Sequence, residues 1–165
     1  MEQPSIRRAV ATDVPAITEL WKELMDFHAV RERYFARAQG GETHFAEFLG
    51  ECVSKAESGV FVADARGVLV GYCLVVEVER PPVFVVTHTV EVLDLAVTEK
   101  WRRSGVGEQL VRKALAWAAS RSAAGVEVKV ATSNDQALAF WRRLGGRPVM
   151  EIIRLEGGYE SSTKR

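Results

Sequence analysis

The sequence has little of what marks metal-binding, disulfide-rich or nucleic-acid-binding proteins. It has two cysteines, Cys52 and Cys73, and no Cys-x-x-Cys pair, so it lacks a zinc framework and favours buried thiols in a reducing compartment over a disulfide. Its three histidines, His28, His44 and His88, lack the spacing of metal ligands, and no metal is expected. Its 22 Lys and Arg residues equal its 22 Asp and Glu residues in number, whereas a general nucleic-acid binder needs a basic excess.

Targeting and membrane-spanning signals are also missing. Residues 1–4 have neither the basic nor the apolar region of a signal peptide. The longest apolar stretch, residues 68–76, is much shorter than the roughly 20 residues that span a bilayer. We therefore expect a cytoplasmic protein with no membrane or nucleic-acid partner. Because a domain has roughly 100–200 residues, the 165 residues predict one domain, with a core over about 5–156 and a polar tail over 157–165.

The apolar residues follow helical and strand periods in turn. Apolar positions at a period of 3.6 residues predict four helices, over 13–30, 43–53, 105–122 and 134–144. Runs rich in β-branched residues predict strands over 6–10, 60–63, 68–78, 89–97, 127–131 and 148–155, with a further extended piece over 83–86. The order β-α-α-β-β-β-α-β-α-β predicts a single-domain α/β fold. Its sheet is mixed, mostly antiparallel and twisted, with helices on both faces.

One turn has the composition of an anion site. The strand that ends at Val97 leads into Arg102, Arg103 and Ser104, and a helix follows from Gly105. The first turn of a helix has unpaired N–H groups and the positive end of the helix dipole. Glycines there let a ligand touch the backbone, and the arginines and the serine add charge and donors. The turn therefore predicts a phosphate or pyrophosphate site.

Two common phosphate motifs do not fit this turn. A Walker A loop needs Gly-Lys-Ser/Thr, which is absent. The dinucleotide fingerprint needs a small third residue where this chain has Leu110. Glu127 lies 20 residues after Gly107, but it begins a strand rather than ending one.

Two blocks of sequence resemble the GNAT superfamily of N-acetyltransferases. Residues 102–107 match its Arg/Gln-x-x-Gly-x-Gly/Ala motif, and residues 134–145 are similar to its C-terminal motif. The element order also resembles the family from Ile6 to Leu155. The resemblance implies a GNAT-like fold, acetyl-CoA as acyl donor, and a primary amine of a small molecule that attacks directly in a ternary complex. A protein lysine or N-terminal acetyltransferase and a non-catalytic CoA-binding regulatory module are the alternatives.

The resemblance also implies which residues hold the donor. The backbone of Leu95, Ala96 and Val97 would pair with the pantetheine arm, and a bulged, splayed strand would leave an N–H near Leu95 for the thioester oxygen. The turn and the two residues of the second motif would bind the rest of the cofactor: Arg102, Arg103, Ser104, Gly105, Val106, Gly107, Asn134 and Trp141.

Trp141 departs from the family, which often has tyrosine at this position. An indole N–H donates a hydrogen bond but does not give up its proton at neutral pH. The usual acid for the leaving thiolate is therefore missing, and Tyr34, Tyr159, a water or no acid at all are the alternatives. Trp141 then packs against the CoA sulfur or in the core.

Two acids of the same strand are candidates for the base that takes a proton from the amine. Glu91 and Asp94 are three residues apart, so they face opposite sides of an unbroken strand, and only a bulge would change that. Some family members carry a base glutamate at the position of Glu91. We therefore favour Glu91, acting directly or through a water, over Asp94. Either acid would otherwise be a surface or structural carboxylate.

The acceptor pocket is expected between the first two helices and the splayed strands. Its candidate residues are Phe27, His28, Glu32 and Tyr34, with His88 as a further candidate. An ordinary histidine at a helix end and a solvated charged loop are the structural alternatives. Dimers are common among similar proteins, and a homodimer through the edge of the last strand is one alternative for the assembly.

Overall fold

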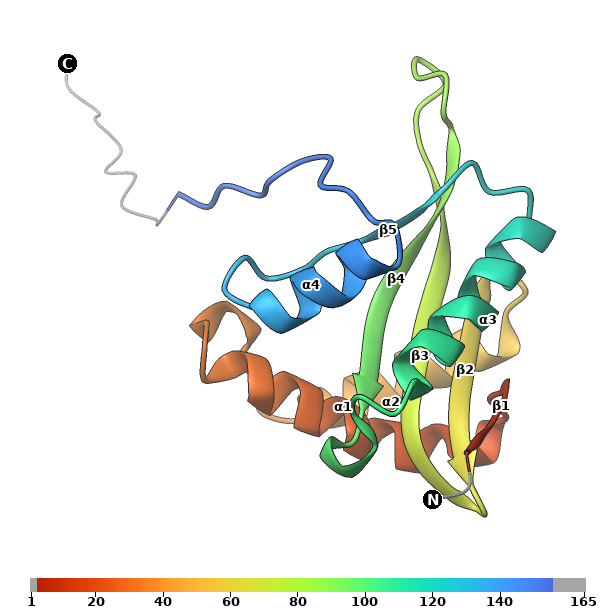
Figure 1. Ribbon diagram of the computed structural model, residues 1–165, viewed down its shortest axis with the longest axis vertical. Coiled ribbons are helices and arrows are strands. Elements are labelled where there is room, and N and C mark those ends of the chain that lie inside the picture. The colour runs from red at the N-terminus through yellow and green to blue at the C-terminus, as the bar shows by residue number, and fades with distance from the viewer. Residues whose placement is uncertain (1–2, 156–165) are drawn as a thin grey trace. The chain divides into compact units, whose positions relative to one another are not determined.

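The computed structural model describes residues 3–155 of the chain (Figure 1). Its internal contacts divide these residues into two units, residues 3–133 and residues 134–155, each of which is described by itself. The predicted polar tail, residues 157–165, and Tyr159 lie outside the described residues.

The first unit contains a five-stranded sheet in which the strands lie in chain order. The strands are β1 (Ser5–Arg8), β2 (Ser58–Ala65), β3 (Val68–Glu79), β4 (His88–Val97) and β5 (Val126–Val128). The first four pair antiparallel, and β5 pairs parallel to β4. The mixed, mostly antiparallel sheet is therefore confirmed, with β5 shorter than expected.

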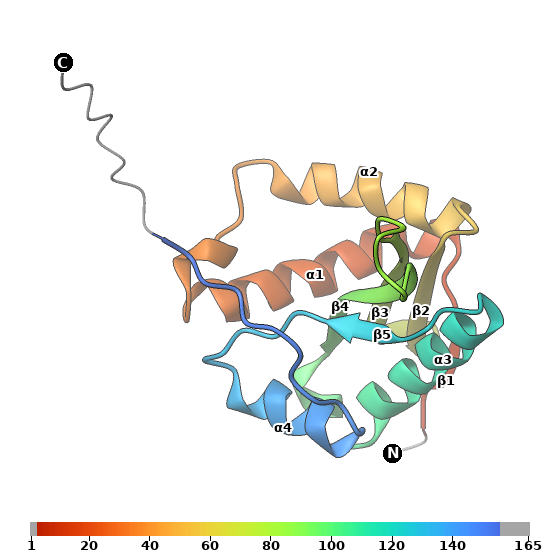
Figure 2. The same ribbon diagram turned by 90° about the horizontal axis from the view of Figure 1, so that it is seen from above.

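Helices cover both faces of this sheet (Figure 2). Helices α1 (Val14–Ala29) and α2 (Gly41–Ser54) lie on one face, and α3 (Val106–Ser120) lies on the other. Short 3-10 turns occur at Ala11–Asp13, Arg33–Phe35 and Glu99–Trp101. The main core lies under α1 and α2, where fully buried Ile17 and Leu49 pack with Val62, Tyr72 and Leu74 of the sheet.

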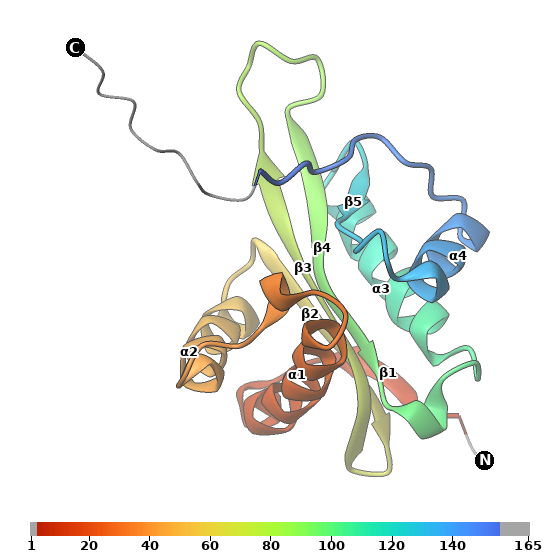
Figure 3. The same ribbon diagram turned by 90° about the vertical axis from the view of Figure 1, so that its left-hand side faces the viewer.

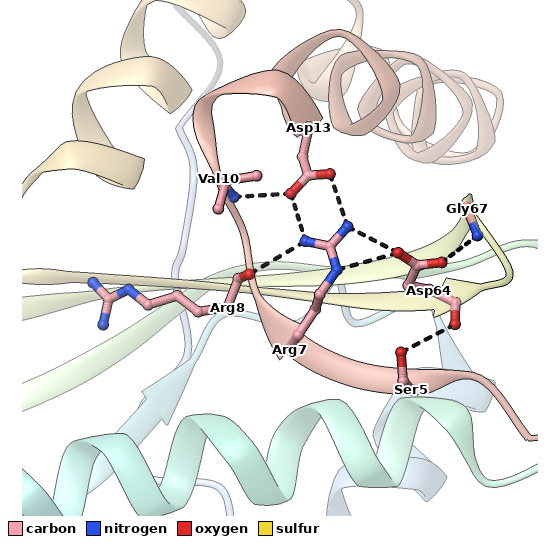
Figure 4. A network of polar contacts seen from close by, with 7 residues as sticks. All are labelled: Ser5, Arg7, Arg8, Val10, Asp13, Asp64 and Gly67. Carbon is pink, nitrogen blue, oxygen red and sulfur yellow. Dashed lines mark hydrogen bonds and ion pairs between the residues drawn. The ribbon is translucent and has the colours of Figure 1, made fainter.

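One arginine joins three parts of the first unit (Figure 4). Arg7 of β1 donates two hydrogen bonds to Asp13, of 2.7 and 3.0 Å, and two to Asp64, of 3.1 and 2.9 Å. Asp13 also accepts from the Val10 N–H, and Asp64 from the Gly67 N–H. The network therefore ties β1 to the start of α1 and to the β2–β3 turn.

Two expected extended segments are wrong. Residues 83–86 are not extended strand: a turn over 82–83 and a bend over 84–85 form the tip of the β3–β4 hairpin, which projects from the first unit (Figure 3). Pro81 and Pro82 have no N–H to donate to a ladder, and the Phe84 N–H closes a turn onto Pro81 instead.

The expected last strand, residues 148–155, is not a strand in the second unit. That unit contains α4 (Asp135–Arg143), and the chain after it has no regular structure as far as residue 155. Ile152 and Ile153 are 71% and 72% exposed. Strand-forming residues need a neighbouring strand to satisfy their backbone, and this segment has none among the described residues.

Candidate functional site

A β-bulge interrupts β4 at the predicted site. Leu74 of β3 lies opposite Asp94, and the next residue, Val75, lies opposite Val92. Leu93 is therefore an extra residue in β4, and the side-chain alternation shifts by one position there.

This shift places the two candidate acids on one face of the sheet. Glu91 lies opposite Val76, and Asp94 lies opposite Leu74. Val76 and Leu74 are two residues apart in β3, so they and their partners share a face. Leu74 belongs to the core beneath α1 and α2, and Val76 packs against that core. The bulge that the sequence left open is thus present, and the acids share the face on which the acceptor pocket was expected.

The two acids have different partners. The Glu91 side chain is 19% exposed and forms an ion pair with Lys129, whose Nζ lies 2.6 Å from Glu91 Oε1. Lys129 follows the short parallel strand β5, in which Glu127 lies beside Glu91. Glu91 is therefore held beside a cation where β4 pairs with β5.

Asp94 has no ion pair in the part of the chain that the structure describes. Burial raises the pKa of its carboxyl to about 6, although the nearby Tyr72 hydroxyl lowers it. Tyr72 is itself fully buried, and its hydroxyl has no hydrogen-bond partner of acceptable geometry among the described residues. Burial and the Asp94 carboxylate both raise the pKa of Tyr72. Asp94 is thus a desolvated carboxylate beside an unsatisfied hydroxyl.

The edge of β4 beyond the bulge is open. Strand β5 pairs with residues 90–92 only, so residues 93–97 have β3 on one side and no described strand on the other. The Thr98 N–H donates to the Val70 carbonyl of β3 at 2.9 Å. Because backbone directions alternate along an antiparallel ladder, Ala96 also points to β3, whereas Leu95 and Val97 point to the open edge.

The N-terminus of α3 lies at the end of this strand and has no capping side chain. Gly105, at the N-cap, has a φ of +89°, and Arg103 has a φ of +61°. This left-handed conformation is easy for glycine but costs a non-glycine residue on the order of 1 kcal/mol. The Ser104 hydroxyl donates to the Trp101 carbonyl, and Val106 is fully buried, which fixes the turn. The exposed side chain of Arg103 has no ion pair among the described residues.

The positions of the turn have unequal roles. Arg102 Nε donates to the Val97 carbonyl at 3.0 Å, and the Arg102 guanidinium lies 5.6 Å from the centre of the Phe27 ring in α1. Arg102 thus fixes the turn against β4 and α1, and one outward carbonyl of the open edge is occupied by the chain itself. The turn leaves Arg103, the α3 N–H groups and the space at Gly105 for an anion.

The predicted acceptor residues lie around the end of α1. His28 packs between Phe27 and Phe35, with ring centroids 5.4 and 5.2 Å away. Its buried Nδ1 has no partner among the described residues, and burial, together with the charge of Arg31, lowers its pKa. The Glu32 carboxylate accepts from the Tyr34 N–H and so caps the short turn after α1.

Tyr34 and His88 fit the predicted pocket less well. Tyr34 is 67% exposed and stacks edge-on against Phe35. His88 Nε2 lies 3.0 Å from Glu77 Oε2, and Glu77 also pairs with Arg121 after α3. Glu77, Glu79 and His88 share the face opposite Glu91, because Glu79 lies opposite His88 in the ladder.

The second unit contains the two remaining predicted donor residues. The Asn134 side chain accepts from the Ala137 N–H at 3.1 Å and so caps α4. Trp141 stacks edge-on against Phe140, with ring centroids 5.1 Å apart, and its carbonyl accepts from the Gly146 N–H. Both residues therefore have a structural role within their own unit.

Two further features are absent from the described residues, 3–155. No cluster of three or more His, Cys, Asp or Glu side chains is arranged to hold a metal ion there. No helix in that range is long and apolar enough to cross a membrane. Cys52 and Cys73 are both buried, free thiols.

In this α/β fold, an open strand edge lies beside an uncapped, basic helix N-terminus, an arrangement whose chemistry suits an extended anionic ligand. A profile of the Acetyltransferase (GNAT) family matches residues 17–146 of this chain. The chain therefore belongs to the GNAT family, as its sequence motifs predicted, and members of that family use acetyl-CoA.

Individual relatives agree with the family match. An uncharacterised N-acetyltransferase of Methanocaldococcus jannaschii is 26% identical over 148 residues, which cover 86% of this chain and 59% of that protein. This chain thus spans less than two thirds of that relative. The BH1408 protein of Bacillus halodurans, solved as a mutant form, is 25% identical with a TM-score of 0.83, over 92% of this chain and 98% of that one.

An aminoglycoside 6'-N-acetyltransferase of Acinetobacter haemolyticus has the same fold. It is 16% identical with a TM-score of 0.73, over 93% of this chain and 98% of that chain. The GNAT-like α/β fold predicted from the sequence is therefore confirmed.

Sequence reasoning missed two residues of the site. Lys129 lies 38 positions after Glu91, and only the parallel pairing of β4 with β5 brings the two together. Tyr72 is one of several apolar-looking positions in a long β-branched run, and no local signal separates it from its neighbours. Its proximity to Asp94 follows from the β3–β4 register and the bulge.

Proposed function

We propose that this protein is an acetyltransferase that transfers the acetyl group of acetyl-CoA to a primary amine of a small molecule, by direct attack in a ternary complex. The observation that carries the proposal is the open edge of β4, with Leu95 and Val97 pointing outward, next to the uncapped N-terminus of α3. An extended donor with a pyrophosphate group fits such an edge and helix terminus together.

The residues present fit acetyl-CoA. The N–H groups from Arg103 to Gly107 would hold the pyrophosphate, and the unpaired Arg103 guanidinium would add a charge-assisted contact. The outward Leu95 carbonyl and Val97 N–H would pair with the pantetheine arm, as an added strand does, and the Leu95 N–H would remain for the thioester oxygen. The family profile continues across residue 134, which supports a single acyltransferase domain that includes Asn134 and Trp141 as donor-binding residues.

The chemistry needs a base and an oxyanion donor. Bound acetyl-CoA supplies a thioester with an electrophilic carbonyl carbon and a thiolate that can leave. The Leu95 N–H would donate to the carbonyl oxygen, and such donors contribute about 3–4 kcal/mol in other enzymes. An alkylammonium resembles lysine, with a pKa of about 10.4, so the amine must first lose a proton. Glu91 would accept that proton, directly or through a water.

Two parts of the proposal concern the acid and the assembly. Trp141 is not a proton donor, so the thiolate leaves unprotonated or takes a proton from water. A homodimer is supported by the exposed apolar side chains of residues 149–155, which a second copy would bury.

Calorimetric titration with acetyl-CoA tests the proposal. We expect micromolar binding to the wild-type protein. Arg103→Ala should raise Kd roughly 10- to 100-fold, because a hydrogen bond to a charged group contributes about 1.5–3 kcal/mol. Lys113→Ala is the matched control, since Lys113 is an exposed cation further along α3 and should leave Kd unchanged. A folded wild-type protein that does not bind acetyl-CoA would refute the proposed function.

A further inference from the structure

The two carboxylates on the acceptor face of β4 are not equivalent. Glu91 already has a cation, Lys129, at 2.6 Å. Asp94 forms no ion pair with any described residue, and it lies in a desolvated region close to the Tyr72 hydroxyl. A desolvated carboxylate without a cation is costly, and native proteins usually pair it.

From this difference we infer that Asp94 binds a second ammonium group of the acceptor, and that the acceptor is a linear diamine or polyamine. The inference rests on the proposed function, because it concerns the acceptor of that reaction. It gives Asp94 a role in binding and specificity, while Glu91 keeps the role of base.

Tyr72 provides an independent observation at the same place. Its side chain is fully buried, its hydroxyl has no partner of acceptable geometry, and it lies close enough to Asp94 for each to shift the pKa of the other. Unsatisfied buried hydroxyls are rare in native proteins and call for an explanation. A cation bound at Asp94 would draw the carboxylate into a fixed position, in which one oxygen accepts from Tyr72 and the other faces the ammonium group.

The register of the strands gives the spacing between the two amines. Glu91 and Asp94 lie opposite Val76 and Leu74, which are two residues apart on β3. At a rise of about 3.3 Å per residue, their backbones lie roughly 7 Å apart along the sheet. With carbon–carbon bonds of about 1.5 Å, a diamine of roughly three to five carbons spans a comparable distance. A monoamine leaves Asp94 unpaired.

The transfer step then balances without Asp94. The reacting ammonium group gives up one proton to Glu91, and its lone pair then forms the new C–N bond with the thioester carbonyl carbon. The nitrogen gives up its second proton to water as the amide forms. The C–S bond breaks, and the sulfur leaves with its electron pair as thiolate. The second nitrogen stays protonated and remains paired with the Asp94 carboxylate throughout.

Acetylation of 1,4-diaminobutane and of 4-amino-1-butanol tests the inference, because these acceptors differ only in the distal group. We expect kcat/KM of the wild-type protein to be at least about 30-fold higher for the diamine, since ion pairs to a desolvated carboxylate contribute about 2 kcal/mol or more. In Asp94→Asn the ratio should fall below about threefold. Glu23→Gln, which removes an exposed carboxylate of α1, should keep the wild-type ratio.

Calorimetry with protein saturated by CoA measures the same site without turnover. The diamine should bind the wild-type protein at least about tenfold more tightly than Asp94→Asn, while the amino alcohol should bind both alike. The inference would be overturned if the wild-type protein had similar kcat/KM values for the diamine and the amino alcohol, or if Asp94→Asn kept the wild-type ratio of these values. Either result would leave the proposed acetyltransferase activity unaffected. Selective diamine binding without acetylation would instead support the ammonium site and contradict the proposed function.

Discussion

The environment of a single residue decides its chemistry at this site. Glu91 and Asp94 carry the same functional group on the same face of β4, yet one is paired with Lys129 and the other is desolvated beside Tyr72. The two carboxylates, which the sequence left as alternatives for one role, therefore have different surroundings.

Replacing Glu91 by glutamine tests its role as base. The variant keeps the size and polarity of the side chain but removes its capacity to accept a proton. We expect kcat/KM for the amine to fall roughly 100- to 10,000-fold near pH 7, the usual contribution of general base catalysis. Affinity for acetyl-CoA should stay within about twofold, because Glu91 is not part of the proposed donor site. Initial rates and calorimetry measure the two quantities.

Glu127→Gln is the matched control for this variant. Glu127 is the neighbouring carboxylate on β5, in register with Glu91, so its removal changes the local charge by the same amount. It should retain most of the activity. Equal activity of Glu91→Gln and wild type from about pH 6 to 9 would show that Glu91 is not the base, since base catalysis depends on protonation state.

The sequence could predict features that depend on local chain geometry. The glycine turn and its arginines could be predicted because a strand, a turn and a helix N-terminus are contiguous in the sequence. The partners of Glu91 and Asp94 could not, because one depends on a parallel pairing and the other on a one-residue bulge. A register shift of one residue moves a side chain to the other face, and local patterns do not specify it.

Among the elements, β1 depends most clearly on a single side chain. It has only four residues and pairs with one neighbour, β2, and Arg7 joins it to Asp13 and Asp64. Replacing Arg7 by methionine keeps the aliphatic stem but leaves two partly buried carboxylates without their cation. We expect the free energy of unfolding to fall by about 2–3 kcal/mol, measured by urea denaturation.

Lys22→Met provides the comparison for an exposed ion pair. Lys22 pairs with Glu19 on the surface of α1, at 2.8 Å. Exposed ion pairs contribute little to stability, so the free energy of unfolding should change by no more than about 0.5 kcal/mol. If Arg7→Met lowered the free energy of unfolding as little as Lys22→Met, the Arg7 network would not be what holds β1 in place.

Helices were predicted more reliably than strands. The apolar stripe of α1 specifies both its type and its buried face, because neighbours at helical spacing are local. The segments 83–86 and 148–155 have the composition of strands, but a strand also needs a partner, and composition does not say whether one is available. The same limit explains why β5 is only three residues long.

At the scale of the whole molecule, acids with shifted pKa values have opposite effects on how stability depends on pH. The hydrogen bonds from Arg7 lower the pKa of Asp13, and bonds from Gly67 and Arg7 lower the pKa of Asp64, so the stability they contribute is lost as the pH falls through their folded pKa values. Asp94 acts in the opposite direction. Its folded pKa of about 6 exceeds the usual value of about 3.9, so stability falls as the pH rises between these values.

Replacing Asp94 by asparagine should therefore stabilise the protein at neutral pH. A shift of roughly two pKa units corresponds to about 2–3 kcal/mol, present in full above about pH 6 and absent near pH 4. Urea denaturation of both proteins from pH 4 to 8 measures the difference and cancels the contribution of His28, whose lowered pKa acts in both. A difference that does not vary with pH would show that Asp94 is not the group that titrates. Higher stability of Asp94→Asn at neutral pH would agree with the general observation that functional residues often lower the stability of a protein.

The open edge of β4 has a consequence for the exchange of amide hydrogens with solvent. Beyond Leu93, alternate N–H groups belong to two populations, because Thr98 and Ala96 face β3 while Leu95 and Val97 face an edge with no described strand. Protection from exchange follows hydrogen bonding, so slow and fast amides should alternate along this half of the strand in the free protein. A ligand that pairs with the edge would slow exchange only at the Leu95 and Val97 amides. The alternation of exchange rates would then disappear from β4, while the amides of the other strands kept their exchange rates.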